Sequence, residues 1–239
     1  MEGGSLPLPS TDATRDATLT VAIQELHFNF GRHRVLQGVE LTLGPGDCGA
    51  LFGANGSGKS TLLGILATRY RPRRGRYLLD GREVTPDLGH WARSQLLFIG
   101  HATHLYGHLT PLENLRFFAD LRGLRPTDRT LAETVAQVGL GAFARRPVRG
   151  FSAGMRKRLA LSRVLLARPA LLLLDEPYSA LDGPGVEWLN GLLRDYLIGG
   201  GTLVMASHDP GRVAALPHRP FQLREGRLQA GPAAGGEGC

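Results

Sequence analysis

Nine residues, GANGSGKST at positions 53–61, constrain the fold of this chain more than any other stretch. They match the pattern G-x-x-x-x-G-K-[S/T] and stand between a strand-like run, GALF, and a helix-like run, TLLGILATRY. Glycines at 53, 56 and 58 let the backbone N–H groups turn inward, and the following helix adds the positive end of its dipole. The segment therefore predicts a phosphate-binding loop, and a glycine-rich turn that matches by chance is the less favoured interpretation.

The side chains at the end of this loop match the chemistry of a nucleoside triphosphate. The ammonium group of Lys59 can reach the β- and γ-phosphates, and the hydroxyl group of Ser60 can bind Mg²⁺. We expect the whole segment to bind ATP, namely Gly53, Ala54, Asn55, Gly56, Ser57, Gly58, Lys59, Ser60 and Thr61.

A second apolar run, ALLLLDEP, ends in two acidic residues. Four apolar residues carry Asp175 to the carboxyl end of a buried strand, which is where open α/β sheets bind ligands. Asp175 would hold Mg²⁺, directly or through water, and Glu176 would polarise the attacking water. A solvated strand end is the simpler alternative, which the phosphate loop makes less favoured.

The order of apolar patterns predicts the fold class. Residues 26–30 and 39–43 alternate with period two, as antiparallel strands do, whereas GALFG, QLLFIG, ALLLLDEP and TLVMASH are continuous runs typical of a covered parallel sheet. Helical patterns lie at 59–68, 111–122, 128–138, 154–167 and 184–198. We expect an α/β three-layer core with a small antiparallel β subdomain and a helical insertion at about residues 86–150.

Composition limits the classes of binding partner but does not identify a single one. The 239 residues carry a formal charge of +7, which favours a nucleotide, a nucleic acid or an acidic membrane, although a basic surface without specific meaning is equally compatible. Two cysteines, Cys48 and Cys239, are too few for a disulfide framework and fit a reducing cytoplasm. No apolar run has the length of a membrane span, and residues 1–18 and 230–239 read as disordered or flexible tails.

A second helix N-terminus suited to an anion is predicted at FSAGM, residues 151–155. Ser152 has the position of an N-cap, and Gly154 exposes backbone N–H groups. A single ATP does not need two such sites in one subunit. Two subunits placed head to tail, each covering the nucleotide of the other, would explain both.

Taken together, residues 19–229 resemble a single nucleotide-binding domain of the ATP-binding cassette (ABC) transporter family, which has the P-loop NTPase fold. The resemblance rests on GANGSGKS, FSAGM (LSGGQ in the family), LLLLDEP, SALD at 179–182 and SHD at 207–209. It implies that Phe30 stacks on adenine, that Asp182 joins the two sites across the dimer, and that His208 contacts the γ-phosphate. It also implies that the signature residues Ser152, Ala153, Gly154 and Met155 contact the partner subunit's ATP.

Three histidines within eight residues, His101, His104 and His108, raise the alternative of a metal or heme site. Gly100, Gly107 and Pro111 interrupt any helix that would align them, so this interpretation is less favoured. In the ABC family His101 occupies the place of a Gln that contacts Mg²⁺ or the attacking water; Mg²⁺ prefers oxygen, so direct ligation by imidazole is not expected. The sequence LLFIGH, followed by LTPLENLRFF, resembles the corresponding sequence of the ATPase subunit of the heme exporter of cytochrome c maturation.

These observations predict an ATP-hydrolysing subunit that uses ATP and Mg²⁺, forms a head-to-tail dimer and joins integral membrane permease subunits. It would lie peripherally on the cytoplasmic face of the inner membrane. An exporter cassette for a drug, lipid or ion is the alternative within this class. A soluble cassette acting on nucleic acid or the ribosome is less favoured, because such proteins fuse two cassettes or add coiled coils, so no nucleic-acid partner is expected.

Overall fold

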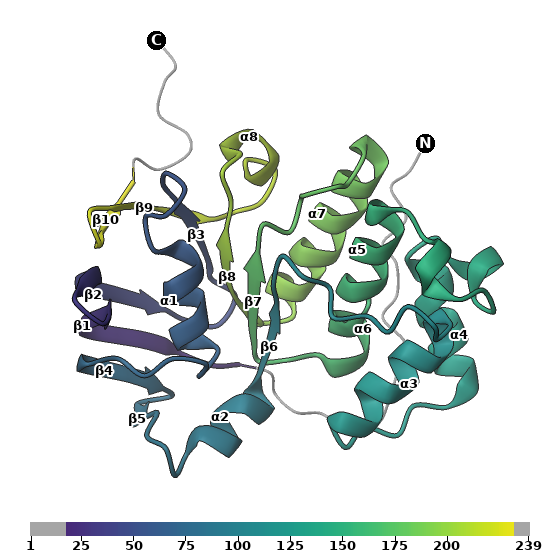
Figure 1. Ribbon diagram of the computed structural model, residues 1–239, viewed down its shortest axis with the longest axis horizontal. Coiled ribbons are helices and arrows are strands. Elements are labelled where there is room, and N and C mark those ends of the chain that lie inside the picture. The colour runs from purple at the N-terminus through teal and green to yellow at the C-terminus, as the bar shows by residue number, and fades with distance from the viewer. Residues whose placement is uncertain (1–17, 232–239) are drawn as a thin grey trace. The chain divides into compact units, whose positions relative to one another are not determined.

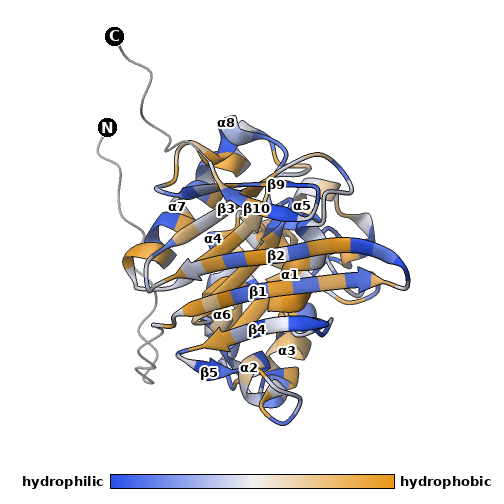
Figure 2. Cartoon of the chain, turned by 90° about the vertical axis from the view of Figure 1, so that its left-hand side faces the viewer, coloured by the Kyte–Doolittle hydropathy of each residue, from blue (hydrophilic) through white to orange (hydrophobic). Residues whose placement is uncertain are grey.

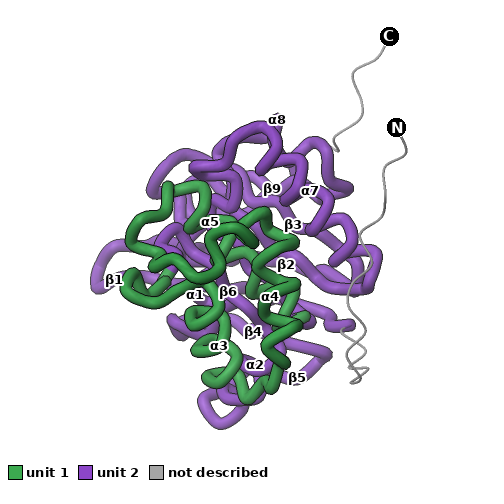
Figure 3. Tube along the Cα trace, turned by 90° about the vertical axis from the view of Figure 1, so that its right-hand side faces the viewer, with its two compact units in different colours: residues 1–16, 104–168 green, residues 17–103, 169–239 purple. Residues whose placement is uncertain are grey.

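The computed structural model describes residues 18–231 and divides into two compact units (Figure 3). The larger unit joins the described parts of 17–103 and 169–239, and the smaller one is His104–Arg168. The predicted tails, 1–18 and 230–239, lie almost entirely outside the described residues. The predicted insertion, 86–150, overlaps the smaller unit but begins and ends earlier, so these domain limits stay a prediction.

The larger unit contains a four-stranded antiparallel sheet with the order β2-β1-β4-β5. Its strands are β1 Val21–Phe30, β2 His33–Leu43, β4 Arg74–Leu79 and β5 Arg82–Glu83. Apolar residues alternate with polar ones along β1 and β2, as the banding in Figure 2 shows, because only one face of this sheet is buried. The predicted antiparallel character of this region is confirmed.

The second sheet of the larger unit has six strands in the order β10-β9-β3-β8-β7-β6. They are β3 Cys48–Phe52, β6 Leu96–Ile99, β7 Leu171–Asp175, β8 Thr202–Ala206, β9 Arg219–Arg224 and β10 Arg227–Ala230. All neighbours pair in parallel except β10, which pairs antiparallel with β9. The short strands β4, β5, β9 and β10 lack a strong apolar pattern and were not predicted.

Helices cover both faces of the parallel sheet, which confirms the predicted three-layer core (Figure 1). Helix α1, Lys59–Leu66, packs in one hydrophobic cluster with the antiparallel sheet and with Leu171, Leu173 and Val204. The alternate residues Leu172 and Leu174 are equally buried, and the strand pleat turns them toward α7, Gly183–Ile198. Two short helices, α2 Gly89–Gln95 and α8 Pro210–Val213, complete this unit.

The smaller unit is helical. It contains α3 Pro111–Leu121, α4 Asp128–Gln137, α5 Ala153–Leu161, α6 Arg163–Ala167 and two 3₁₀ turns, Gly141–Phe143 and Val148–Gly150. Thr110 and Glu113 form a capping box at the start of α3. The helix predicted at 154–167 is two helices, because the helical hydrogen-bond pattern is interrupted at Ser162. The hydroxyl group of Ser162 donates to the Leu159 carbonyl at 2.7 Å.

Candidate functional site

The loop between β3 and α1 is shaped by glycines in conformations that other residues avoid. Gly53 has φ 151° and Gly58 has φ 107°. A Cβ on Gly53 would lie 2.5 Å from the Leu223 carbonyl oxygen, and one on Gly58 would lie 3.1 Å from Val35. Another residue at Gly53 would therefore clash with backbone as well as strain φ. The loop can wrap an anion only with glycine at these places.

Lys59 is the first residue of α1, and its side chain folds back over the loop. Its ammonium group donates to the carbonyl oxygens of Gly53 at 2.7 Å and Ala54 at 3.0 Å, and the residue is only 7% exposed. The charge is thereby held at the loop rather than free in solvent. This is the position from which an ammonium group can neutralise bound phosphates.

The carboxyl end of β7 carries the two acidic residues. Asp175 is its last residue, and Glu176 follows with φ 50°, a left-handed conformation that costs energy for a residue with a Cβ. The Glu176 N–H donates to the Ala206 carbonyl at 3.0 Å, which ties the turn to β8. The Glu176 Oε2 lies 2.7 Å from Nδ1 of His208. The sequence pointed to each residue separately, and only the structure joins them as a carboxylate–imidazole pair.

A brace of hydrogen bonds holds the two loops that carry this pair. Arg212, in α8 after His208, donates from Nη1 to the Tyr178 carbonyl at 2.8 Å. The phenol of Tyr178 donates to Oδ1 of Asn190 in α7 at 2.7 Å. Burial raises the pKa of the Tyr178 phenol well above its usual range, so that it remains a donor. The brace thus links the loop after Glu176 to α7 and to the helix after His208.

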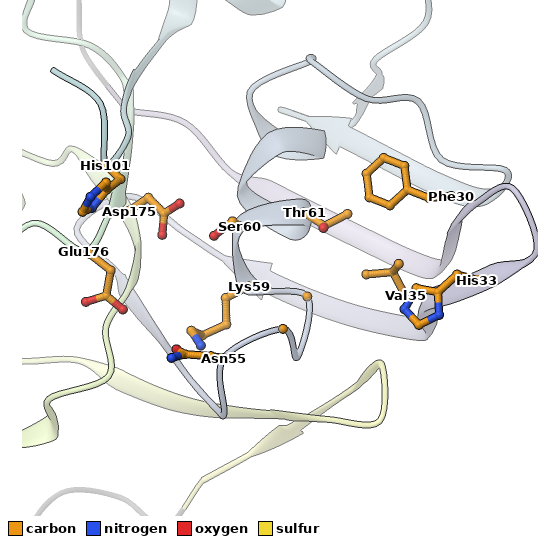
Figure 4. A pocket seen from close by; sticks show the side chains of 12 residues that line it. Phe30, His33, Val35, Asn55, Lys59, Ser60, Thr61, His101, Asp175 and Glu176 are labelled. Carbon is orange, nitrogen blue, oxygen red and sulfur yellow. The ribbon is translucent and has the colours of Figure 1, made fainter. Parts of the chain in front are cut away.

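The phosphate loop, the two acidic residues at the end of β7 and the β1–β2 hairpin line one cavity of about 440 Å³ within the larger unit. In Figure 4, Phe30, His33 and Val35 lie at one end, Asp175, Glu176 and His101 lie at the other, and Lys59 and Ser60 lie between. The remaining lining residues are Asn55, Gly56, Gly58 and Thr61. His33 and Val35 were not predicted, because nothing in the sequence near them signals a ligand; their place follows from the β1–β2 hairpin, in which His33 pairs with Phe30.

The aromatic end of the cavity is supported from behind. Phe30 is 50% exposed and makes edge-on contacts with Phe28, at 4.9 Å between ring centroids, and with Tyr70, at 5.5 Å. Half of the Phe30 side chain therefore remains open to the solvent, and an exposed aromatic ring is a surface that a planar base can stack on. Tyr70 was missed in the sequence, since it lies 40 positions from Phe30.

The three histidines are divided between the two units. His101 lines the cavity, whereas His104 and His108 belong to the smaller unit, where the His104 carbonyl accepts a bond from Arg163 at 2.9 Å. Within residues 18–231, no group of three or more His, Cys, Asp or Glu side chains is arranged to hold a metal ion. The arrangement therefore lends no support to the metal-site alternative.

The predicted signature segment belongs to the smaller unit. Ser152 caps α5 as expected, and its Oγ accepts a hydrogen bond from the Met155 N–H at 3.2 Å. Ser152 and Ala153 are exposed, and Gly154 and Met155 are half-buried. Asp182 caps α7 in the larger unit, where its carboxylate accepts from the Gly185 N–H at 3.0 Å. Neither Asp182 nor the four signature residues line the nucleotide-sized cavity.

Comparison with known proteins identifies the family of this chain. The model of the ABC transporter family matches residues 36–179, more than half of the chain. The chain belongs to the ABC transporter family. The family is one of ATPases that couple ATP hydrolysis to transport, so this ABC protein has an ATP-binding domain.

Curated relatives of this ABC protein share most of their length with it. The cytochrome c biogenesis ATP-binding export protein CcmA of Methylococcus capsulatus is 39% identical over 178 residues, which are 74% of this chain and 86% of the relative. The protein of the same name from Bordetella bronchiseptica is 37% identical over 212 residues, covering 88% and 94%.

Solved structures agree on the fold. An ATP-binding subunit of an ABC transporter superposes with a TM-score of 0.81 at 26% identity and covers 88% of both chains. A dimeric ATP-binding cassette in a post-hydrolysis state with ADP and Pi superposes with a TM-score of 0.80 at 24% identity, a likeness of fold alone. Among residues 18–231, no helix combines the length and apolar character needed to cross a bilayer.

Proposed function

We propose that this chain is the ATP-binding and ATP-hydrolysing subunit of the heme exporter used in cytochrome c maturation. The observation that carries the enzymatic part is the cavity lined by the phosphate loop, Asp175 and Glu176, with His208 2.7 Å from Glu176. The export part rests on relatives named for cytochrome c biogenesis, which align over nearly all of their length.

In this proposal each part of the cavity has one task. Phe30 stacks on adenine, the glycine loop from Gly53 to Thr61 binds the phosphates with its N–H groups, and Lys59 neutralises the β- and γ-phosphates. Ser60 and Asp175 supply hard oxygen donors that line the same cavity, a set that fits Mg²⁺, since this ion accepts one or two protein ligands beside phosphate and water. The bound ion would offset the charge of the phosphates.

Hydrolysis then follows from the carboxylate–imidazole pair. The Glu176 carboxylate accepts a proton from the attacking water while the oxygen of that water bonds to the γ-phosphorus. The bond between the γ-phosphorus and the bridging oxygen breaks, which leaves ADP and phosphate. His208, at 2.7 Å from Glu176, holds that carboxylate and contacts the γ-phosphate. His101 stands where the family uses Gln and offers a ring nitrogen to the water or to the phosphate.

The dimer and the membrane partner complete the proposal. Ser152, Ala153, Gly154 and Met155 of one subunit would contact the ATP of the other, and Asp182 would join the two sites. ATP closes the dimer, hydrolysis reopens it, and this two-state motion is transmitted to the permease subunits. The chain would lie peripherally on the cytoplasmic face of the inner membrane, with no nucleic-acid partner.

The test uses Glu176→Gln, which keeps the shape of the side chain and removes the base. We expect hydrolysis to fall at least about 100-fold while ATP binding remains, so that ATP converts the variant to a stable dimer in light scattering. Wild-type hydrolysis rates in the variant, or a monomer at every ATP concentration with and without the permease, would contradict the mechanism.

A second candidate, drug export, is favoured by one relative. A macrolide export ATP-binding/permease protein of Paracoccus denitrificans is 37% identical over 204 residues, although the match covers only 30% of that protein. Deletion strains separate the two candidates. Loss of heme-stained c-type cytochromes, restored by the wild type and not by Glu176→Gln, supports heme export; normal cytochromes with raised macrolide sensitivity support drug export.

A further inference from the structure

One charged surface of the larger unit contributes no charged side chain to the cavity of the ATP site. Residues 69–76, RYRPRRGR, follow α1 and include the first three residues of β4; they are called here the arginine loop. It carries five arginines and no acidic residue, and all five are exposed: Arg69, Arg71, Arg73, Arg74 and Arg76. No other eight-residue stretch of the chain concentrates charge of one sign to this degree.

The central arginines of the loop have no structural task. Arg69 lies over the ring of Phe98 at 5.4 Å, and Arg76 pairs with Glu83 at 2.9 Å. Arg71, Arg73 and Arg74 make no side-chain hydrogen bond or ion pair with any residue from 18 to 231. Three guanidinium groups close together repel one another, so an anionic partner would stabilise them.

A small cavity of about 190 Å³ opens beside the arginine loop. Its polar lining includes Thr68, Tyr70, Arg71, Thr85 and Arg93, and no acidic side chain is part of it. The Oγ1 atom of Thr68 is buried and has no hydrogen-bond partner in the described part of the chain. A buried hydroxyl group without a partner costs free energy, which an acceptor oxygen of a ligand would recover once the Thr68 side chain turns toward the cavity.

The chemistry of this surface matches phosphate. The guanidinium fork binds phosphate oxygens bidentately, and clusters of four to eight basic residues are attracted to anionic lipid surfaces. The surface is distinct from the ATP site, since the two cavities share no lining residue and lie toward opposite ends of α1, a helix about 12 Å long. Figure 1 shows the loop leaving the end of α1 that is remote from the phosphate loop.

We propose that the arginine loop binds the phosphate groups of anionic lipids, with one headgroup seated in the cavity beside Thr68 and Arg71. The proposal rests on the proposed function only in choosing lipid over other phosphate-bearing partners. It adds a direct contact between the ATPase subunit and the bilayer, independent of the permease.

The test is co-sedimentation of the full chain with vesicles of phosphatidylcholine, with and without phosphatidylglycerol. We expect binding only to the vesicles that contain phosphatidylglycerol. The double variant Arg73→Gln/Arg74→Gln should bind them roughly 30-fold more weakly. The matched control is Arg224→Gln/Arg227→Gln, which removes the same charge from exposed residues of the β9–β10 hairpin and should bind within about twofold of the wild type.

Thr68→Val tests the cavity separately. Valine keeps the shape and removes the unpaired hydroxyl group, so the fold should be equally stable or more stable while vesicle binding weakens about threefold. Unchanged vesicle binding would overturn the headgroup position. Equal binding to neutral vesicles, an equal loss in the hairpin control, or tighter binding to single-stranded RNA through Arg73 and Arg74 would overturn the lipid surface. Glu176→Gln should bind vesicles normally, so the ATPase mechanism can fail without affecting this result.

Discussion

Two helix N-termini of this protein are built in opposite ways. Helix α1 begins after Gly58, and no side chain bonds to its first N–H groups. Helix α5 begins after Ser152, whose hydroxyl oxygen already accepts the Met155 N–H at 3.2 Å. An uncapped helix N-terminus leaves its first backbone N–H groups available to a ligand, whereas in a capped one the side-chain oxygen of the cap already accepts a hydrogen bond from one of them. The first terminus can therefore bind an anion by itself, whereas the second fits the proposed role of adding contacts to an anion that another subunit holds.

The surroundings of the two termini differ in the same sense. The phosphate loop is enclosed by β3, by Leu223 of β9 and by the Lys59 ammonium group, all within one compact unit. Ser152 and Ala153 are exposed on the smaller unit. This contrast is what the head-to-tail proposal requires, because only an exposed terminus can meet the nucleotide of a second subunit.

The largest expected effect comes from Lys59→Met, which keeps the side-chain length and removes the charge. Affinity for ATP should fall about 100-fold or more, because a charge-assisted contact to the phosphates is lost. Binding of a fluorescent ATP analogue to the single chain measures this directly. If ATP affinity is unchanged, the comparison is wrong, since the first terminus would then not depend on its ammonium group.

Ser152→Ala should separate the two termini. ATP affinity of the single chain should stay within about twofold, while hydrolysis by the dimer falls about tenfold through the lost contact to the partner's ATP. The control is Thr127→Ala, which removes the equivalent cap of α4 in the same unit, where Oγ1 accepts from the Thr130 N–H at 3.1 Å. Both changes should destabilise the fold by about 1 kcal/mol. A similar loss of hydrolysis in both variants would show that Ser152 acts only as the N-cap of α5.

The smallest effect is expected from Tyr178→Phe, which cuts the brace behind Glu176 and His208. The turnover number should fall about threefold with KM for ATP unchanged, because the pair is displaced and the phosphate loop is not. Tyr196→Phe is the matched control: its phenol can donate to a carbonyl oxygen of Pro169, Ala170 or Thr202, all within 3.1 Å, and none of these residues lines the cavity. Thermal unfolding should show a similar loss in both variants, and a similar fall in turnover would show that the brace has no special role.

Local sequence patterns were sufficient for much of this site. The phosphate loop, Lys59 and the Asp175–Glu176 pair depend on a strand, a turn and a helix that are consecutive in the chain. The cap at Ser152 depends on one turn of helix. Such features are determined by residues within about four positions of one another, so their spacing alone reveals them.

Contacts between distant segments were decided by the tertiary structure alone. The pairing of Glu176 with His208 exists because β7 and β8 lie in register, with Asp175 opposite Ala206, so that the residues after both strands meet at one edge. Tyr70 supports Phe30 because the end of α1 lies against β1, and His33 reaches the cavity through the β1–β2 hairpin. The sequence by itself determined which groups enter the proposed site, whereas strand register, which is set by burial across the whole sheet, decided which of them touch.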